Sequence, residues 1–163
     1  MKKMIKKVTL LIAIMFMALF TANAQTEKGT ILAGGSVGFD SYTPKGGDAY
    51  STINISPVGG LFLTDGFALG VGVNYLNVDG EDSYGVGPFA RYYFGKTNVF
   101  GQAGYTFMND KQSSVGLKAG YAAFLNEHVA LEPALTYTID SHDGDNTGSG
   151  IGLSVGFQIH LSK

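Results

Sequence analysis

The sequence predicts an all-β fold: an eight-stranded antiparallel up-and-down transmembrane β-barrel, preceded by a cleavable signal peptide. Three observations support this prediction. The N-terminal segment has the composition of an export signal, the remaining chain alternates between large apolar and small residues in eight runs, and the connections between these runs alternate in length. Together they indicate strands that cross a membrane rather than a water-soluble domain.

The N-terminal segment MKKMIKKVTLLIAIMFMALFTANA predicts a secretory signal peptide at residues 1–24. Four lysines make its start basic, and an apolar run follows over residues 8–20. This run is shorter than the about 20 residues that a membrane-spanning helix requires. Ala22-Asn23-Ala24 provides the small residues of a cleavage site. The mature chain is therefore expected to be one domain, the barrel, at residues 25–163.

The composition of the predicted mature chain excludes several functional classes. Without the four signal-peptide lysines, seven basic side chains remain against 13 acidic ones, a net charge of −6. No basic surface is left that would favour nucleic acid. The absence of cysteine excludes disulfides, thiolate metal centres and thiol nucleophiles. The 24 glycines all lie in the mature chain, well above the usual share of about 7%.

Eight segments alternate with a period of two residues, as expected when successive side chains of a strand point to opposite faces. In the last segment, large apolar residues occupy every second position from Ile151 to Leu161, whereas the positions between them are mainly glycine, serine, Gln158 and His160. Each segment is close to the 9–11 residues of a tilted transmembrane strand. The predicted strands are residues 30–41, 51–63, 67–77, 84–94, 98–108, 114–125, 129–139 and 149–161.

The connections between the predicted strands are expected to alternate in length. Tight turns are predicted at residues 64–66, 95–97 and 126–128, and longer, more acidic loops at residues 42–50, 78–83, 109–113 and 140–148. This alternation is typical of transmembrane barrels. A secreted, water-soluble β-sandwich is the alternative, and it is disfavoured because neither face of the strands carries the charged residues of a water-exposed surface.

Aromatic residues near the strand ends predict two membrane-boundary girdles. Tyr75, Tyr105, Phe107 and Tyr137 are assigned to the loop ends, and Phe67, Tyr92, Phe94 and Phe157 to the turn ends. Three prolines conflict with regular strands, because proline removes a hydrogen bond from the ladder. We expect local β-bulges at these positions, which are Pro57, Pro88 and Pro133.

Four stretches carry a resemblance to a known family: ISPVGGLFLTDGFALGVGVNY (55–75), GPFARYYFG (87–95), AAFLNEHVALEPALTY (122–137) and GLSVGFQIHL (152–161). They resemble the small outer-membrane β-barrel domain family common in Bacteroidetes, related to the OmpA transmembrane domain, OmpX and the opacity proteins. The resemblance implies an integral protein of the bacterial outer membrane, in contact with its lipids and lipopolysaccharide. It also implies periplasmic chaperones and the barrel-assembly machinery as partners during biogenesis, and it says little about activity.

Inward-facing polar residues predict a network inside the barrel. Arg91, Gln102, Glu132 and Gln158 each lie about three residues from the turn end of their strand. An unpaired charge in a narrow lumen would cost several kcal/mol, so Arg91 is expected to pair with Glu132. Lys118, one level above, is expected to share the carboxylate. The network is interpreted as a static plug, and the alternative is a gate in which Glu132 moves between Arg91 and Lys118.

Two further groups of residues suggest chemistry only weakly. Asp140, Asp143, Asp145 and Asn146 offer oxygen ligands for a divalent cation, but their spacing does not match an EF-hand loop. Ser141, His142 and Asp143 have the residue types of a hydrolase triad, but consecutive residues do not readily form the required series of hydrogen bonds. The sequence therefore predicts no catalytic residue and no cofactor.

The predicted function is that of a non-enzymatic integral outer-membrane barrel with a structural or surface-contact role in the cell envelope. The first alternative is a narrow passive pore for ions or water. The second is a lipid-modifying outer-membrane enzyme.

Overall fold

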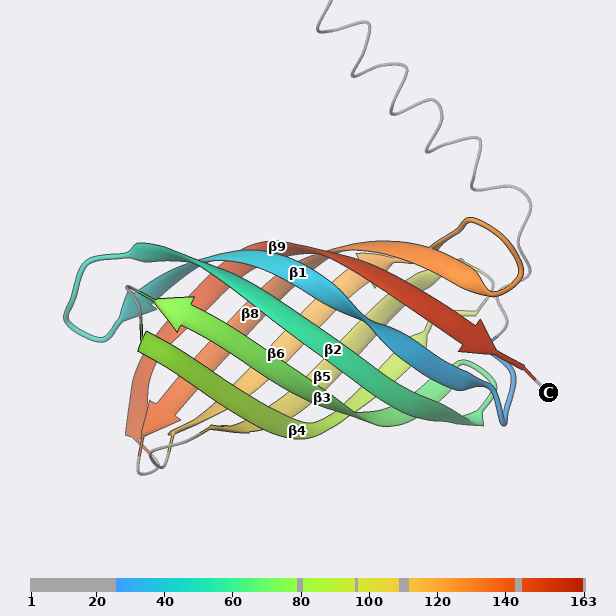
Figure 1. The fold of residues 1–163 in the computed structure, drawn as a ribbon, viewed down its shortest axis with the longest axis horizontal. Helices are drawn as coiled ribbons and strands as arrows, with labels where there is room; N and C mark the ends of the chain where they lie inside the picture. Colours follow the sequence, from blue (N-terminus) through green and yellow to red (C-terminus); the bar gives the residue numbers. More distant parts are fainter. Residues whose placement is uncertain (1–25, 79–80, 96, 109–111, 143–144, 163) are drawn as a thin grey trace, which may run out of the picture.

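The computed structural model describes residues 26–78, 81–95, 97–108, 112–142 and 145–162. These residues form one antiparallel sheet that closes on itself as a barrel (Figure 1). The signal peptide predicted at residues 1–24 lies outside the described residues. Among the described residues, no helix is long and apolar enough to cross a bilayer.

Eight strands form the barrel wall, and one of them is interrupted at Ala122. Their bounds are β1 Ile31–Pro44, β2 Tyr50–Thr64, β3 Phe67–Val78, β4 Glu81–Tyr93, β5 Val99–Met108, β6 Gln112–Tyr121 with β7 Ala123–Phe124, β8 Val129–His142 and β9 Asp145–Leu161. The short β7 continues β6, because Gly120 pairs with Ala134 and Ala123 with Leu131 in the same register on β8. The predicted eight-stranded fold is therefore confirmed.

Closure of the barrel joins the first strand to the last. Each strand pairs with its neighbour in sequence, and β1 pairs with β9 along its whole length, from Ile31 opposite Leu161 to Pro44 opposite Gly148. The sheet therefore has no free edge along the middle of the wall. The C-terminal ends of β2, β4 and β7 lie at one end of the barrel, called the turn end, and those of β1, β3, β5 and β8 lie at the other, called the loop end.

The strands extend further at the loop end than the sequence predicts. β8 runs to His142 and β9 begins at Asp145, so most of the loop expected at residues 140–148 is strand. In the same way β3 ends at Val78 and β4 begins at Glu81. The expectation of longer loops at this end is wrong for these connections, because backbone pairing continues after the apolar alternation has stopped.

The expected β-bulges at the three prolines are absent. At each proline the ladder lacks pairs on one side, between β2 and β3 at Pro57, between β4 and β5 at Pro88, and between β6–β7 and β8 at Pro133. The register is the same before and after each gap, and the other side of each proline stays paired. Among the described residues, the register shifts lie elsewhere, between Phe62 and Thr64 and between Asp140 and Ser141.

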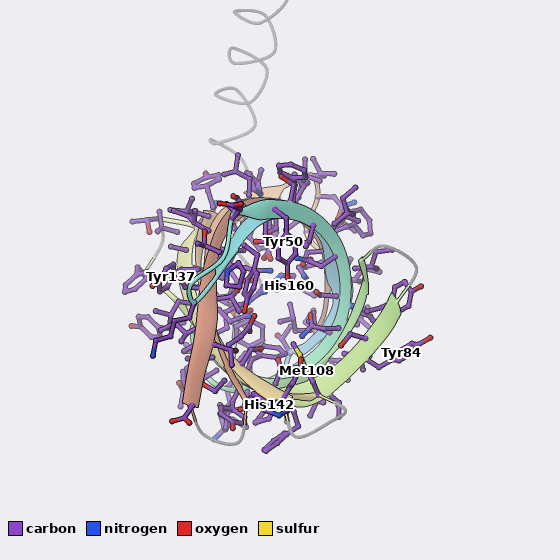
Figure 2. All side chains as sticks on the ribbon, turned by 90° about the vertical axis from the view of Figure 1, so that its left-hand side faces the viewer. Tyr50, Tyr84, Met108, Tyr137, His142 and His160 are labelled. Carbon is purple, nitrogen blue, oxygen red and sulfur yellow. The ribbon has the colours of Figure 1, made fainter. Side chains whose placement is uncertain are left out.

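The outer surface of the barrel is an apolar belt. Large apolar side chains project outward along every strand, for example Val155 at 52% exposed and Leu153 at 66%. Figure 2, which looks into the barrel from the loop end, shows side chains directed away from the ring on all sides. Beyond the belt, the outward positions of β1, β2, β8 and β9 become hydroxyl residues: Ser41, Thr43, Ser51, Ser141 and Ser149. A closed wall with an apolar exterior satisfies its backbone internally, as hydrocarbon requires.

The interior is filled by side chains at the turn end. Its buried apolar residues include Leu32, Phe62, Phe89, Tyr93, Phe100 and Phe124. Glycines on neighbouring strands make room for these rings: a Cβ at Gly70 would lie 2.5 Å from Phe89 Cζ, and one at Gly120 would lie 2.7 Å from Phe100 Cζ. Gly116, nearer the loop end, faces open space instead. The glycine-rich inner face therefore partly accommodates aromatic rings and partly leaves room in the upper lumen.

The apolar belt predicts a position-dependent cost for charge on β9. Val155→Arg places a guanidinium near the middle of the belt and is expected to lower the free energy of unfolding by about 2–4 kcal/mol. Ser149→Arg, on the same strand and face but beyond the belt, is expected to cost about 0–1 kcal/mol. Urea unfolding in phospholipid vesicles, followed by the gel-mobility difference between folded and unfolded barrel, measures both. Equal costs would contradict the assignment of the belt.

Candidate functional site

A buried ion pair crosses the lumen near the turn end. Arg91 comes from β4 and Glu132 from β8, and both face inward because each occupies an inward position of its strand. Arg91 Nη1 donates to Glu132 Oε2 at 2.8 Å and to Oε1 at 3.1 Å. Each residue is 2% exposed. The pairing expected from the sequence is thus present, and it neutralises both charges away from water.

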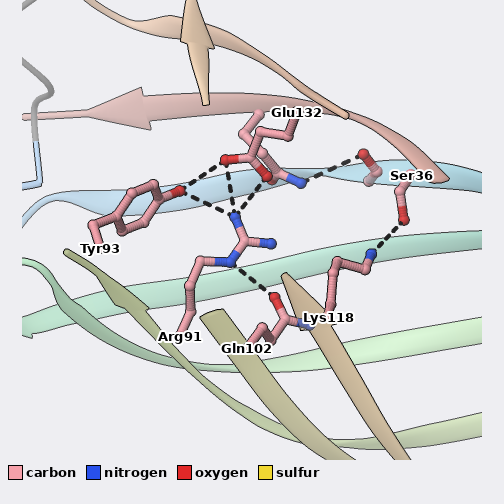
Figure 3. Close-up of polar contacts among 8 residues, drawn as sticks. Ser36, Arg91, Tyr93, Gln102, Lys118 and Glu132 are labelled. Carbon is pink, nitrogen blue, oxygen red and sulfur yellow. Dashed lines mark hydrogen bonds and ion pairs between the residues drawn. The ribbon is translucent and has the colours of Figure 1, made fainter. Parts of the chain in front are cut away.

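Tyr93 and Gln102 complete the coordination of this pair (Figure 3). The Tyr93 hydroxyl donates to Glu132 Oε1 at 2.8 Å and lies 3.1 Å from Arg91 Nη1, from which it accepts. Arg91 Nε donates to Gln102 Oε1 at 2.8 Å. The guanidinium also lies 4.6 Å from the centre of the Phe100 ring, within the range of a cation–π contact. The layer is therefore held by several contacts at once.

Gln158 belongs to the same layer, but among the described residues it makes no hydrogen bond to the ion pair. Its Nε2 donates to the backbone oxygen of Gly35 at 3.4 Å, and its Oε1 has no hydrogen-bond partner among the described residues. Above it on β9, the buried Ser154 hydroxyl also has no partner within the described chain. Such groups in a polar lumen are commonly satisfied by water.

Lys118 is placed differently from the expectation. Its Nζ donates to Ser36 Oγ at 3.1 Å, and it makes no ion pair with Glu132 among the described residues. The register gives the reason: Lys118 lies opposite Thr136 on β8, four residues beyond Glu132. Four residues correspond to roughly 13 Å along a strand. The two residues therefore lie on different levels, and the expected shared carboxylate is not observed (Figure 3).

Two further polar layers, which the sequence analysis missed, lie closer to the loop end. Asp40 accepts from Thr136 Oγ1 at 2.7 Å and from Asn54, and the Asn74 side chain joins Ser56 to Thr106. In the sequence, these layers were indicated only by polar residues at inward positions, which are otherwise mainly glycine. Combining them into layers, however, required knowing which residues lie opposite each other across several strands.

The mouth of the barrel carries Tyr42, Tyr50 and Asp140. The two rings lie 5.3 Å apart, and Tyr50 lies over the mouth in Figure 2. Tyr42 is hydrogen-bonded to the Asp140 carboxylate. Burial raises the pKa of Asp140, which lies beyond the apolar belt, and the bond from Tyr42 acts in the opposite direction. Asp140 is therefore part of the mouth wall rather than a solvated loop residue.

The proposed cation ligands cannot all be placed. Asp143 lies outside the described residues, and the side chain of Asn146 is not described. Asp140 points toward Tyr42, whereas Asp145 is exposed at the start of β9. Within the described ranges, no three His, Asp or Glu side chains are grouped as metal ligands would be. The four-residue site remains a prediction. The sequence analysis assigned no catalytic role to Ser141, His142 and Asp143, and Asp143 lies outside the described residues.

The sequence and the fold were compared with those of known proteins. No family model matches the chain, and no curated protein matches it. Solved structures do match. Neisserial surface protein A superimposes with a TM-score of 0.64 at 12% identity, covering 81% of this chain and 99% of that one. The chain has the fold of a small outer-membrane β-barrel.

Two other matches support the same conclusion about the fold. The N-terminal β-barrel domain of Pseudomonas aeruginosa OprF aligns with a TM-score of 0.51 at 15% identity, over 80% of this chain and 98% of that domain. A de novo designed transmembrane β-barrel aligns with a TM-score of 0.57 at 15% identity, over 83% of this chain and 98% of that one. The resemblance to the small outer-membrane barrels is therefore confirmed for the fold, and its Bacteroidetes type remains a prediction.

The buried ion pair predicts an asymmetric response to substitution. Glu132→Gln keeps the side-chain shape but leaves Arg91 buried and unpaired, so it is expected to lower the free energy of unfolding by about 3–5 kcal/mol. The double variant Arg91→Met with Glu132→Leu removes both charges and is expected to lose much less. Urea unfolding in lipid vesicles measures both variants. A single variant as stable as the unsubstituted protein would show that the pair contributes little.

Proposed function

We propose that this protein is a non-enzymatic, integral barrel of the outer membrane that serves the cell envelope as a structural or surface-contact element rather than as an open channel. The observation that carries this proposal is the closed turn end of the lumen. The Arg91–Glu132–Tyr93 layer spans the interior, and aromatic side chains fill the space around it. The apolar belt supplies the membrane contact.

The number of contacts that Arg91 makes within the plug favours a static role. Arg91 contacts Glu132, Tyr93, Gln102 and the Phe100 ring at once, so an opening movement would have to break all of these contacts together. Lys118, the alternative partner for Glu132, is on another level and bonded to Ser36. The same proposal includes the partners of the barrel. Its outer wall contacts outer-membrane lipids and lipopolysaccharide, and the barrel-assembly machinery inserts it with the help of periplasmic chaperones.

A narrow pore is the second candidate, and the upper lumen favours it. The inner surface there is polar, with the Asp40 and Asn74 layers, and Gly116 faces open space. Polar groups and free space of this kind suit water or ions, but conduction would also require a path past the plug. The third candidate, a lipid-modifying enzyme, predicts a change in the mass spectrum of lipid A when the protein is produced.

Planar-bilayer recording separates the first two candidates. The purified barrel is expected to show no steady openings, because the plug blocks ions. Glu132→Gln is expected to leave the recordings silent as well, since the neutral amide still fills the layer. Lys118→Met serves as the control, because it removes a charge from the lumen without touching the plug.

Steady openings of the unsubstituted protein would favour the pore. Openings that appear only in Glu132→Gln, and not in Lys118→Met, would favour a gate at the ion pair. Silence in all three, combined with increased sensitivity of cells lacking the protein to SDS and EDTA, is the result expected for an envelope element.

A further inference from the structure

The outer wall of the barrel has two sides that differ in their tyrosines. Six tyrosines occupy outward positions, and all of them lie on β3–β6 and β8. The outward positions of β9, β1 and β2 contain none. These adjacent strands are called the tyrosine-free face. The outward tyrosines are Tyr75, Tyr84, Tyr92, Tyr105, Tyr121 and Tyr137.

Tyrosine at a membrane boundary is favourable because its ring lies among acyl chains while its hydroxyl reaches the headgroups. In Figure 2, Tyr84 points away from the barrel in this manner. A surface that is covered by protein meets no headgroups and gains nothing from such residues. The uneven distribution therefore indicates that lipid covers the wall from β3 to β8, and that something else covers the tyrosine-free face.

The tyrosine-free face has a low patch between β1 and β2. Ala33 lies opposite Gly59, and Gly35 lies opposite Pro57, so four small residues from β1 and β2 adjoin one another. A Cβ added at Gly59 would have no heavy atom within 4 Å, so the surface is open there. Larger residues border the patch at both ends, with Ile31 opposite Leu61 and Val37 opposite Ile55. On the β9 side, Ile159 lies opposite Ala33 and Phe157 opposite Gly35. This shape permits two barrel walls to approach closely.

The extent of the face matches what a stable interface requires. Outward positions number seven on each of the three strands, 21 in all, from residues 31–43, 51–63 and 149–161. One side of a standard protein interface contains roughly 20–30 residues. None of the 21 positions is charged. Beyond the belt, the hydroxyls of Ser41, Ser51 and Ser149 extend the same surface into the polar region, so a partner can contact it along its whole height.

The opposite side of the barrel also has small residues, but in a different setting. Ala90, Gly101, Ala103 and Ala119 form the floor of an apolar hollow whose border includes Tyr92, Phe94 and Tyr137. Here the boundary tyrosines are present, so the hollow belongs to the lipid-covered side. It provides matched positions, equally small and outward, against which the tyrosine-free face can be tested.

We propose that the tyrosine-free face of β9, β1 and β2 binds a second copy of this chain, so that two barrels pack side by side in the membrane. A second copy suits the face because it presents the same uncharged surface, with a low patch and a raised border, and therefore meets it without burying a charge. A two-fold axis through the Ala33–Gly59 patch brings the two low patches together, which is the usual symmetry of homodimers.

Single-cysteine cross-linking in cell membranes tests this arrangement, because the chain has no cysteine of its own. Ala33→Cys and Gly59→Cys are expected to form disulfide-linked dimers upon mild oxidation, since residues near the axis bring two thiols close. The matched controls Ala90→Cys and Gly101→Cys, in the opposite hollow, are expected to remain monomeric. Reaction with a membrane-permeant maleimide verifies that all four thiols are accessible.

Three outcomes would overturn the proposal: equal cross-linking at both pairs, cross-linking only at the control pair, and no cross-linking at Ala33→Cys and Gly59→Cys although their thiols react. The last outcome would assign this face to lipid.

A second measurement does not depend on thiol geometry. Ala33→Trp is expected to abolish cross-linking by an amine-reactive reagent in membranes while the heat-modifiable folded band remains, whereas Ala90→Trp is expected to leave dimers intact.

Discussion

The absence of hydrogen-bonding solvent inside a bilayer is the constraint on which this structure depends. Every backbone group within the belt must find a partner in the protein itself, and for strands this requires a closed sheet. The pairing of β1 with β9 along its whole length meets this requirement. The three prolines show how far it can be relaxed: each interrupts one ladder locally, but the register survives and the other neighbour remains paired.

Closure with eight strands leaves a lumen that side chains largely fill. This explains why glycine is so frequent on the inner face, since rings such as Phe89 and Phe100 occupy the places that side chains at Gly70 and Gly120 would take. It also explains the buried ion pair. A charge in this space cannot reach bulk water, so Arg91 and Glu132 are compatible with the fold because they neutralise each other and share Tyr93. Packing and electrostatics therefore close the turn end together.

The outer surface follows a different rule, because its large side chains meet lipid or protein rather than one another. Strands β3–β6 and β8 carry boundary tyrosines, whereas the outward positions of β9, β1 and β2 carry aliphatic residues, small residues and two phenylalanines, Phe39 and Phe157, but no tyrosine. The interior determines whether the barrel conducts, and the exterior determines what lies beside it. These two properties vary independently, since outward and inward residues alternate along every strand.

The sequence by itself determined the number of strands, the face on which each residue lies and the identity of the buried pair. Alternation of period two is a local property, and the cost of an isolated buried charge leaves Arg91 and Glu132 few alternatives. Only the tertiary structure decided that Lys118 bonds to Ser36, that Asp40 and Asn74 form layers, and that the prolines cause no bulge. These features depend on the stagger between strands, which sets the residues that lie opposite each other across the lumen. Stagger arises from closure of the whole sheet, and no single segment of the chain encodes it.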